Sequence, residues 1–497
     1  MIRDYLCSMI TDGLTDVKVS LEDDEFKVAF LEGNLAIDCL KITLTQNGTD
    51  DPRSYELVGS LFVNPDEGVT ARLVWERDAE HSYDPFAPLD VMQQIQLGNL
   101  FPESHYFSLR AVDIAGRRWT HPAVFLKREE WERVEILTVS CDSIQVESET
   151  TDKSTLAHFV FHEELGIEVN SAHSSTAPVR NRRREVTKRT AAKGSIGPFE
   201  IDYYPVLAHK LGNAHELSAV TNSKNPVPNH FDERLLEAVQ FSVAKLAWPI
   251  MREVIQGGKQ IVTLSKSTPF NNGHVQPAVP GYAEADFYRL MGCYYQYACL
   301  AAKGDGAPPL SKTLRGLFTL KGVWLDTIAL LLAVSVESLL NDPVYKEFGA
   351  PDEEGRRKIQ ELIAYVTKAS FDRKLTERAA NVMGGMMSSS ASDKLHVLAK
   401  AGVIDEEDIK AWKAIRNAAA HGGLKVDLSS LKNALAQVNR LVAMTYKLVF
   451  LRIGYQGKYV DYATSGWPTA QFDAVKCKEQ LDKLSEQSNL RGQEIER

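Results

Sequence analysis

Apolar, β-branched and aromatic residues gather in short runs along the first 228 residues of the chain. The runs are EFKVAFL, LAIDCLKITLT, YELVGSLFV, VTARLVW, YFSLRAV and FEIDYYPV. Runs of this length and composition are typical of strands. Turn signals such as Asn47-Gly48 and Pro65-Asp66 separate them. The pattern predicts a β-rich domain over 1–228, an antiparallel sheet that is a sandwich or barrel-like.

The spacing of apolar residues changes after Asn229. A helical stripe is expected from the positions of Leu235, Leu236, Val239 and Val243. A second helix, AEADFYRLMGCYYQYACLAAK, follows, and GDGAPP has the composition of a linker. Residues 229–312 are therefore predicted to form a helical connecting region.

Only helical patterns occur from residue 313 onward. WLDTIALLLAVSVESLL is nearly all apolar and predicts a buried helix. KIQELIAYV places Ile359, Leu362, Ile363 and Val366 at the spacing of an amphipathic helix. We expect a helical bundle over 313–455 and a polar C-terminal helix or tail over 456–497. The predicted fold class is a multidomain α+β protein.

Composition narrows the functional classes. A chain of 497 residues is expected to form two or three domains, and its net charge of -9 argues against a surface coated in nucleic acid. The six cysteines form no Cys-x-x-Cys pair, which favours a reducing, cytoplasmic location. The longest apolar run, Ile328 to Val336, is too short for a membrane span, so no membrane association is expected.

No sequence motif for a metal or cofactor is found. His158 and His162 are four apart in a predicted strand, which separates them by about 13 Å, too far to hold one ion. GGKQ at 257–260 lacks the full phosphate-loop pattern. Neither a nucleophile elbow nor a dinucleotide fingerprint occurs, and we expect no cofactor.

One stretch of the N-terminal region, 178–194, is strongly basic. From Arg180 to Lys193 it holds seven basic residues and one acidic one, with almost no large apolar residue. Such a stretch is expected to be a mobile loop. It is either simply solvated or an arm that contacts a nucleic-acid backbone. The residues that would make the contact are Arg180, Arg182, Arg183, Arg184, Lys188 and Arg189.

The segment RNAAAHGG, residues 416–423, is the clearest candidate for chemistry. It ends a predicted helix that begins at the cap Asp405 and buries Ile409, Trp412 and Ile415, with Ala419 completing the stripe. Gly422 supplies a residue that closes many helices, which puts His421 in the final turn. The carbonyl end of the helix favours a protonated imidazole there, suited to acid or base work near neutral pH.

The helical period separates the two ionisable residues of this segment. Asn417 and His421 share a face, whereas Arg416 lies about 140° around the helix from His421. On a single helix, Arg416 and His421 cannot both easily contact one phosphate. Two copies packed across a twofold axis would bring Arg416 and His421 of both copies into a shared cleft. The alanines at 418–420 leave room for a close partner. The sequence therefore predicts a homodimer.

Arg416, Asn417 and His421 match the R-N-x-x-x-H signature of HEPN domains, which are all-helical modules found in ribonucleases of toxin and anti-phage systems. LLLAVSVESLL, with Glu337, is similar to the acidic first helix of that family, and LTERAANVM and ASDKLHVLAKAG resemble the middle of Apea-like members. The resemblance covers roughly 315–455. A β-rich half joined to such a domain also resembles ApeA-type anti-phage proteins.

The resemblance implies metal-independent cleavage of RNA, with tRNA as one candidate, in abortive-infection defence set off by a phage-derived trigger. The ribose 2′-hydroxyl attacks the adjacent phosphate and leaves a 2′,3′-cyclic phosphate. His421 moves the protons, Arg416 stabilises the charged intermediate and Asn417 holds the ring or the phosphate. Glu337 positions His421 or Arg416, or is a plain helix-end carboxylate. The alternative is a non-catalytic HEPN protein that dimerises and binds nucleic acid or nucleotide.

Overall fold

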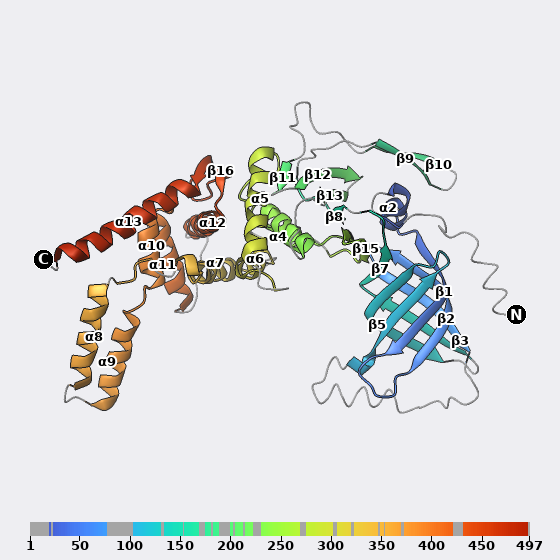
Figure 1. Ribbon diagram of the computed structural model, residues 1–497, viewed down its shortest axis with the longest axis horizontal. Helices are drawn as coiled ribbons and strands as arrows, with labels where there is room; N and C mark the ends of the chain where they lie inside the picture. Colours follow the sequence, from blue (N-terminus) through green and yellow to red (C-terminus); the bar gives the residue numbers. More distant parts are fainter. Residues whose placement is uncertain are drawn as a thin grey trace. The chain divides into compact units, whose positions relative to one another are not determined.

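The computed structural model divides the chain into two compact units (Figure 1). The first comprises Met1–Val227 and Ala247–Phe270, and the second comprises Pro228–Leu246 and Asn271–Arg497. The structure describes residues 19–20, 23–76, 103–130, 134–152, 154–167, 174–179, 182–187, 199–201, 204–211, 214–221, 230–268, 275–301, 306–319, 323–345, 348–351, 353–368, 372–420 and 431–495.

A six-stranded antiparallel barrel forms the start of the first unit. Around the barrel the strands run β1–β2–β3–β6–β5–β4 and back to β1, because β5 pairs with both β4 and β6. The barrel-like expectation for this region is confirmed. The strands are β1 (Leu35–Gln46), β2 (Ser54–Asn64), β3 (Gly68–Glu76), β4 (Tyr106–Asp113), β5 (Arg118–Glu130) and β6 (Val134–Cys141), with the short helix η1 (Glu103–His105) before β4.

Alternation of buried and exposed positions explains why these segments form a barrel. In β4, Phe107, Leu109 and Ala111 are buried while Arg110 between them is exposed. Side chains on alternate positions of a strand point to opposite faces, so one face of each strand fills the barrel and the other meets solvent.

A helix, α2 (Asp24–Leu31), precedes the barrel where the sequence pattern of EFKVAFL predicted a strand. The prediction was wrong because the run is too short for its period to decide between helix and strand. Asp23 caps the helix by accepting hydrogen bonds from the backbone N–H groups of Glu25 and Phe26. Phe26 and Phe30 are then buried in the core that the barrel strands share.

The remaining strands of the first unit extend the sheet from β5. Their order is β5–β7–β15–β14–β8–β13–β12–β11, with every pair antiparallel. The strands are β7 (Ser143–Glu149), β8 (Thr155–Phe161), β11 (Phe199–Ile201), β12 (Tyr204–Leu211), β13 (Ala214–Thr221), β14 (Met251–Gln256) and β15 (Lys259–Ser265).

β14 and β15 correct the helical connecting region predicted for 229–312. After α4 (Phe231–Val243) the chain returns to the first unit as a hairpin. Gly257 and Gly258, in the segment GGKQ, form its two-residue turn with φ values of 62° and 79°. Glycine adopts positive φ values at little cost, and a two-residue turn of this kind matches the twist of the strands.

The basic stretch 178–194 also differs from its prediction. Instead of a loop throughout, part of it is a second hairpin of β9 (Ser174–Val179) and β10 (Arg182–Thr187), in which Arg182 is paired with Val179. β10 contains Arg182, Arg183 and Arg184. Arg180, Lys188 and Arg189 lie outside the described residues.

The second unit is largely helical. α7, nearly all apolar, packs against α11 and α12, while α10 packs against α7 and α11. α4 packs against α5, and α6 against α7. The bounds are α5 (Glu284–Ala301), α6 (Pro309–Phe318), α7 (Leu325–Leu340), η2 (Pro343–Tyr345), α10 (Ala391–Lys400), α11 (Glu406–Ala420) and α12 (Leu431–Ile453). The helical bundle expected over 313–455 is present, and the α+β class of the chain is confirmed.

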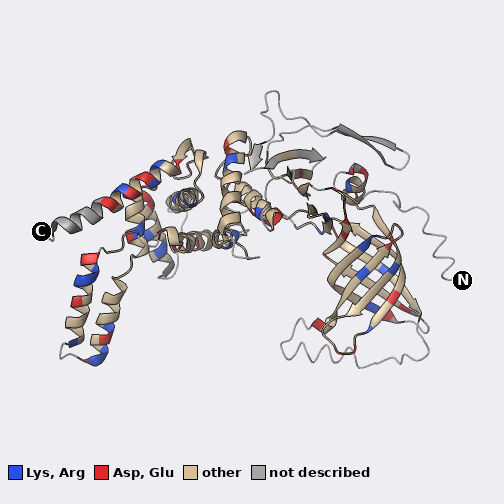
Figure 2. Ribbon diagram, in the orientation of Figure 1, with Lys and Arg blue, Asp and Glu red and all other residues tan. Residues whose placement is uncertain are grey.

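Two further helices, α8 (Glu353–Lys368) and α9 (Arg373–Gly385), pack side by side, and none of their described residues is buried (Figure 1). α8 and α9 carry several charged residues each (Figure 2). In α7 the charged residues are Asp326 and Glu337, and most of the others are apolar. The polar C-terminal segment begins with a hairpin of β16 (Gln456–Val460) and β17 (Thr469–Asp473) and continues as the helix α13 (Ala474–Ile495). Among the described helices, none has the length and apolar character to cross a membrane.

Candidate functional site

The candidate site is built on α11. Asp405 and Asp408 close the first turn, where the Asp405 backbone N–H donates to the Asp408 carboxylate over 3.1 Å. Ile409, Trp412 and Ile415 are buried, as the sequence pattern predicted. The exposed face of the helix therefore carries the remaining positions, among them Arg416 and Asn417.

A buried carboxylate fixes this helix against α12. Asp408 is fully buried and accepts a hydrogen bond from Arg440 Nη1 at 3.2 Å, with Lys447 Nζ at 3.6 Å. Burial raises the pKa of Asp408, since a carboxylate loses its hydration there, and the two cations offset that cost. The first turn of α11 is thus anchored to α12, and this anchor supports the C-terminal part of the helix, which carries Arg416.

Arg416 and Glu337 meet across two helices. Arg416 Nε donates a hydrogen bond to Glu337 Oε1 on α7. The Arg416 side chain is 52% exposed and that of Glu337 is 33% exposed. Of the two expected partners of Glu337, the structure brings Arg416 to it, while His421 lies outside the described residues.

Trp412 lies beneath the guanidinium. The central carbon of that group is 5.7 Å from the centre of the indole ring, within the range of a cation–π contact. The indole Nε1 donates to the carbonyl of Ala333 on α7 over 3.3 Å, which fixes the ring. Sequence reasoning assigned Trp412 to the core alone, because its second contact depends on where α7 packs.

These contacts restrain the Arg416 side chain but leave its Nη groups able to bind an anion. Within the described part of the chain, its only hydrogen bond runs from Nε, so its Nη groups have donors to offer an anion. The paired N–H donors of a guanidinium match the geometry of two phosphate oxygens. Asn417 is exposed beside it, Ala418 is half-buried, and the side chains of Ala419 and Ala420 lie outside the described residues, as do His421 and Gly422.

The other predicted nucleic-acid contacts belong to the first unit. Arg182, Arg183 and Arg184 are part of β10, whereas Arg416 and Glu337 are part of the second unit. The structure therefore places the two groups of predicted site residues on separate bodies of the chain.

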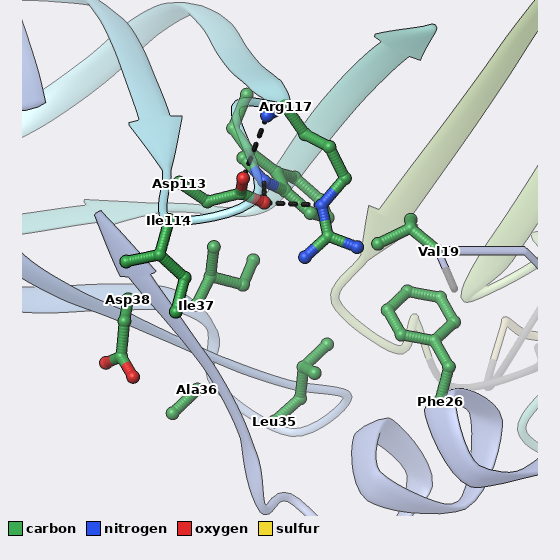
Figure 3. Close-up of a pocket in the computed structure, with 10 residues that line it drawn as sticks. Val19, Phe26, Leu35, Ala36, Ile37, Asp38, Asp113, Ile114 and Arg117 are labelled. Carbon is green, nitrogen blue, oxygen red and sulfur yellow. Dashed lines mark hydrogen bonds and ion pairs between the residues drawn. The ribbon is translucent and has the colours of Figure 1, made fainter. Parts of the chain in front are cut away.

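A small pocket lies in the first unit at one end of the barrel (Figure 3). The Asp113 carboxylate there accepts hydrogen bonds from the backbone N–H and Nε of Arg117 and from Trp119 Nε1, at 2.6–2.9 Å. Apolar residues, Phe26 and Ile37 among them, line the rest. Its volume of about 20 Å³ is room for about one water molecule, so it does not accept a nucleotide.

Among the described residues, no three His, Cys, Asp or Glu side chains come together as a metal-binding group. Comparisons of the chain with protein-family models, with curated proteins and with solved structures found no match.

Proposed function

We propose that the chain is a metal-independent endoribonuclease of the HEPN type. The observation that carries the proposal is the guanidinium of Arg416, held by Glu337 and Trp412 on the exposed face of α11. It belongs to the last part of α11, five residues before His421 in the sequence, inside a largely helical unit. A fixed arginine with unused donors is suited to stabilise negative charge that develops on a phosphate.

The reaction divides among few groups. The 2′-hydroxyl of RNA attacks the adjacent phosphorus, and the 5′-oxygen leaves. Arg416 stabilises the charge on the phosphate, His421 transfers protons and Asn417 orients the ring or the phosphate. Glu337 positions Arg416, because its carboxylate fixes the Nε side of the guanidinium and leaves the Nη side to the substrate.

The active form is a homodimer in this proposal. α7 exposes Leu330 (42%) and Val334 (52%), which lie on one helical face with Glu337. An apolar stripe that leads to the Arg416–Glu337 pair suits a second copy of the helical unit, so that residues of both copies form one cleft.

The first unit is proposed to act as sensor or RNA-docking module, with the arginines of β10 as its phosphate contacts. The biological setting we propose is anti-phage defence by abortive infection, in the cytoplasm, set off by a phage-derived trigger. The resemblance of 315–455 to Apea-like HEPN domains supports this setting, and the free state of the described cysteines supports the location.

One observation favours a second candidate, a non-catalytic HEPN protein that dimerises and binds nucleic acid or nucleotide. Glu337 neutralises Arg416, and a neutralised pair also serves to join two helices. The two candidates differ in whether RNA is cut.

The test is incubation of the purified protein with total tRNA and mRNA, with the cleaved ends mapped. We expect 2′,3′-cyclic phosphate ends that persist in EDTA and disappear in Arg416→Ala and His421→Ala. Arg373→Ala is the matched control, since Arg373 is an exposed helical arginine paired with Glu377 at 2.9 Å. Cleavage that requires magnesium contradicts the chemistry, and intact RNA under every condition favours the non-catalytic candidate.

A further inference from the structure

A second histidine contacts α11, the helix on which the candidate site is built. His396 belongs to α10, and its side chain is 41% exposed. Its Nδ1 is 3.4 Å from the Glu406 carboxylate, and its Nε2 is 3.2 Å from Lys413 Nζ. Both partners are on α11, so the ring bridges the two helices.

The chemistry of its partners fixes how the ring carries its proton. A carboxylate only accepts hydrogen bonds, so the nitrogen facing Glu406 is the N–H donor. A lysine ammonium only donates, so the nitrogen facing Lys413 presents a lone pair. In this arrangement Nδ1 donates to Glu406 and the lone pair of Nε2 faces Lys413, so Nε2 is the ring atom placed to take a proton.

Lys413 lies close in sequence to Arg416 and Asn417 on α11, so it connects the His396 ring to the face of the helix that carries them. Asn417 is four residues after Lys413, which is about 6 Å along the axis and about 40° around it. Arg416 is about 60° to the other side. Lys413 thus lies between the two around the helix, and the three form one cationic and polar patch, in which Arg416 and Asn417 are exposed and Lys413 is half-buried.

The proposed reaction needs two proton transfers. One group removes the proton of the 2′-hydroxyl, and another gives a proton to the departing 5′-oxygen. With His421 alone, one ring must perform both. His396, whose Nε2 contacts Lys413 of the patch, supplies a second group for this work.

We propose that His396 is a second proton-transfer group of this site, with Lys413 binding the phosphate next to it. The inference rests on the proposed ribonuclease function. A phosphate draws Lys413 away from Nε2, and Nε2 then takes the proton of the 2′-hydroxyl. The 2′-oxygen bonds to phosphorus, the bond from phosphorus to the 5′-oxygen breaks, and His421 protonates that oxygen. Glu406 stabilises the imidazolium, which returns its proton to water.

The charged groups that face the ring come from both packed helices. Glu406 and Lys413 face it from α11. Asp393, whose charge interacts with the ring, and Lys400, one turn on, are on α10 itself. All four are present in every variant below except Lys413→Met.

The first experiment measures single-turnover RNA cleavage between about pH 5 and pH 9. General acid–base groups typically contribute 10²–10⁴-fold, so His396→Gln is expected to slow cleavage by at least about 100-fold and to abolish the fall in rate at low pH. His230→Gln is the matched control, because His230 is also exposed beside a glutamate, Glu233, at 3.8 Å. His396→Gln with wild-type rate and pH profile overturns the inference and leaves the ribonuclease intact.

Lys413 is tested by steady-state cleavage kinetics on the same RNA. Lys413→Met is expected to raise KM by about tenfold or more with a smaller change in kcat, because it removes a phosphate contact. Lys410→Met is the control, since Lys410 lies one turn earlier on α11 and pairs with Glu407 at 2.8 Å. Equal KM values for both variants overturn the role of Lys413.

A second measurement does not depend on cleavage. Nitrogen NMR of the full chain with labelled histidine reports which ring nitrogen carries the proton, and uridine 3′-monophosphate is the probe. We expect the Nδ1–H form in the free protein, and a shift of the His396 signal on addition of the nucleotide that is lost in Lys413→Met. An unchanged His396 signal overturns the inference even if RNA is cut. Inert wild-type protein refutes the proposed function instead.

Discussion

Arg416 is restrained on two sides by different forces. Its Nε donates a hydrogen bond to Glu337, and its central guanidinium carbon lies over the ring of Trp412. A planar guanidinium can stack on an aromatic ring and at the same time donate two parallel hydrogen bonds to one anion. The ammonium group of lysine is a compact point charge without this planar geometry. Its geometry as well as its charge is therefore expected to matter for function.

This argument predicts the effect of Arg416→Lys. The variant keeps the positive charge but loses the paired N–H donors of the guanidinium, so we expect kcat to fall by about 100-fold or more. An exposed ion pair contributes about 0–1 kcal/mol, so the melting temperature should change little. Cleavage assays and thermal unfolding check both parts, with Arg373→Lys as the control. A large loss of melting temperature would assign Arg416 a structural role.

The sequence predicted part of this site at the level of residues. The helical period of α11 correctly identified Ile409, Trp412 and Ile415 as buried. The period gives no information on partners from other helices. The contact of Trp412 with Ala333, and that of His396 with Lys413, depend on how α7 and α10 pack against α11, which no local pattern encodes.

At the scale of elements, the start of α10 has a defined stabilising feature. The Ser390 hydroxyl accepts from the Asp393 backbone N–H, and the Asp393 carboxylate accepts from the Ser390 backbone N–H, which together form a capping box. The hydrogen bond from Ser390 Oγ also lowers the pKa of Asp393 below its ordinary value of 3.8.

We predict that Ser390→Ala destabilises the helical unit by about 1 kcal/mol at neutral pH. A carboxyl group whose folded-state pKa is lowered stabilises the fold above its unfolded pKa, and that stabilisation is lost as pH falls through the folded-state pKa. The difference between variant and wild type should therefore shrink below about pH 3.8. Urea unfolding across pH measures it, with Ser388→Ala as the control. A difference that is constant with pH contradicts the assignment.

The β10 hairpin gives a prediction about binding. Neutralising Arg182, Arg183 and Arg184 should weaken RNA affinity and lower the slope of log affinity against log salt by about two to three, because each phosphate contact releases about one counterion. Binding measured across a salt series checks this. If the affinity and slope both stay at the wild-type values, these arginines are only solvated.

Short apolar runs were the least predictable elements. EFKVAFL has strand composition but folds as α2, since Asp23 caps it and Phe26 and Phe30 reach the core from one helical face. MREVIQ and KQIVTLS were predicted within a helical region although two glycines between them form a hairpin turn. In both cases the long-range packing decided between structures that the local pattern left close in energy.

At the scale of the whole molecule, the separation of Arg416 from His421 around the helix predicts a composite site. Mixing an Arg416→Ala protomer with a His421→Ala protomer should restore part of the cleavage activity that each homodimer lacks. Activity of the mixture and sedimentation at the assay concentration check this. An active monomer, or a mixture without activity, contradicts shared sites.

The path of the chain between its two units has a consequence for how such a protein can change. The chain leaves the first unit for α4, returns for β14 and β15, and leaves again. A gene fusion that took only residues 1 to about 228 would therefore carry the barrel but lack β14 and β15, two strands of the same sheet. Recombination would have to carry both segments of a unit together, so the β-rich and helical halves are expected to be inherited as one block rather than shuffled as interchangeable modules.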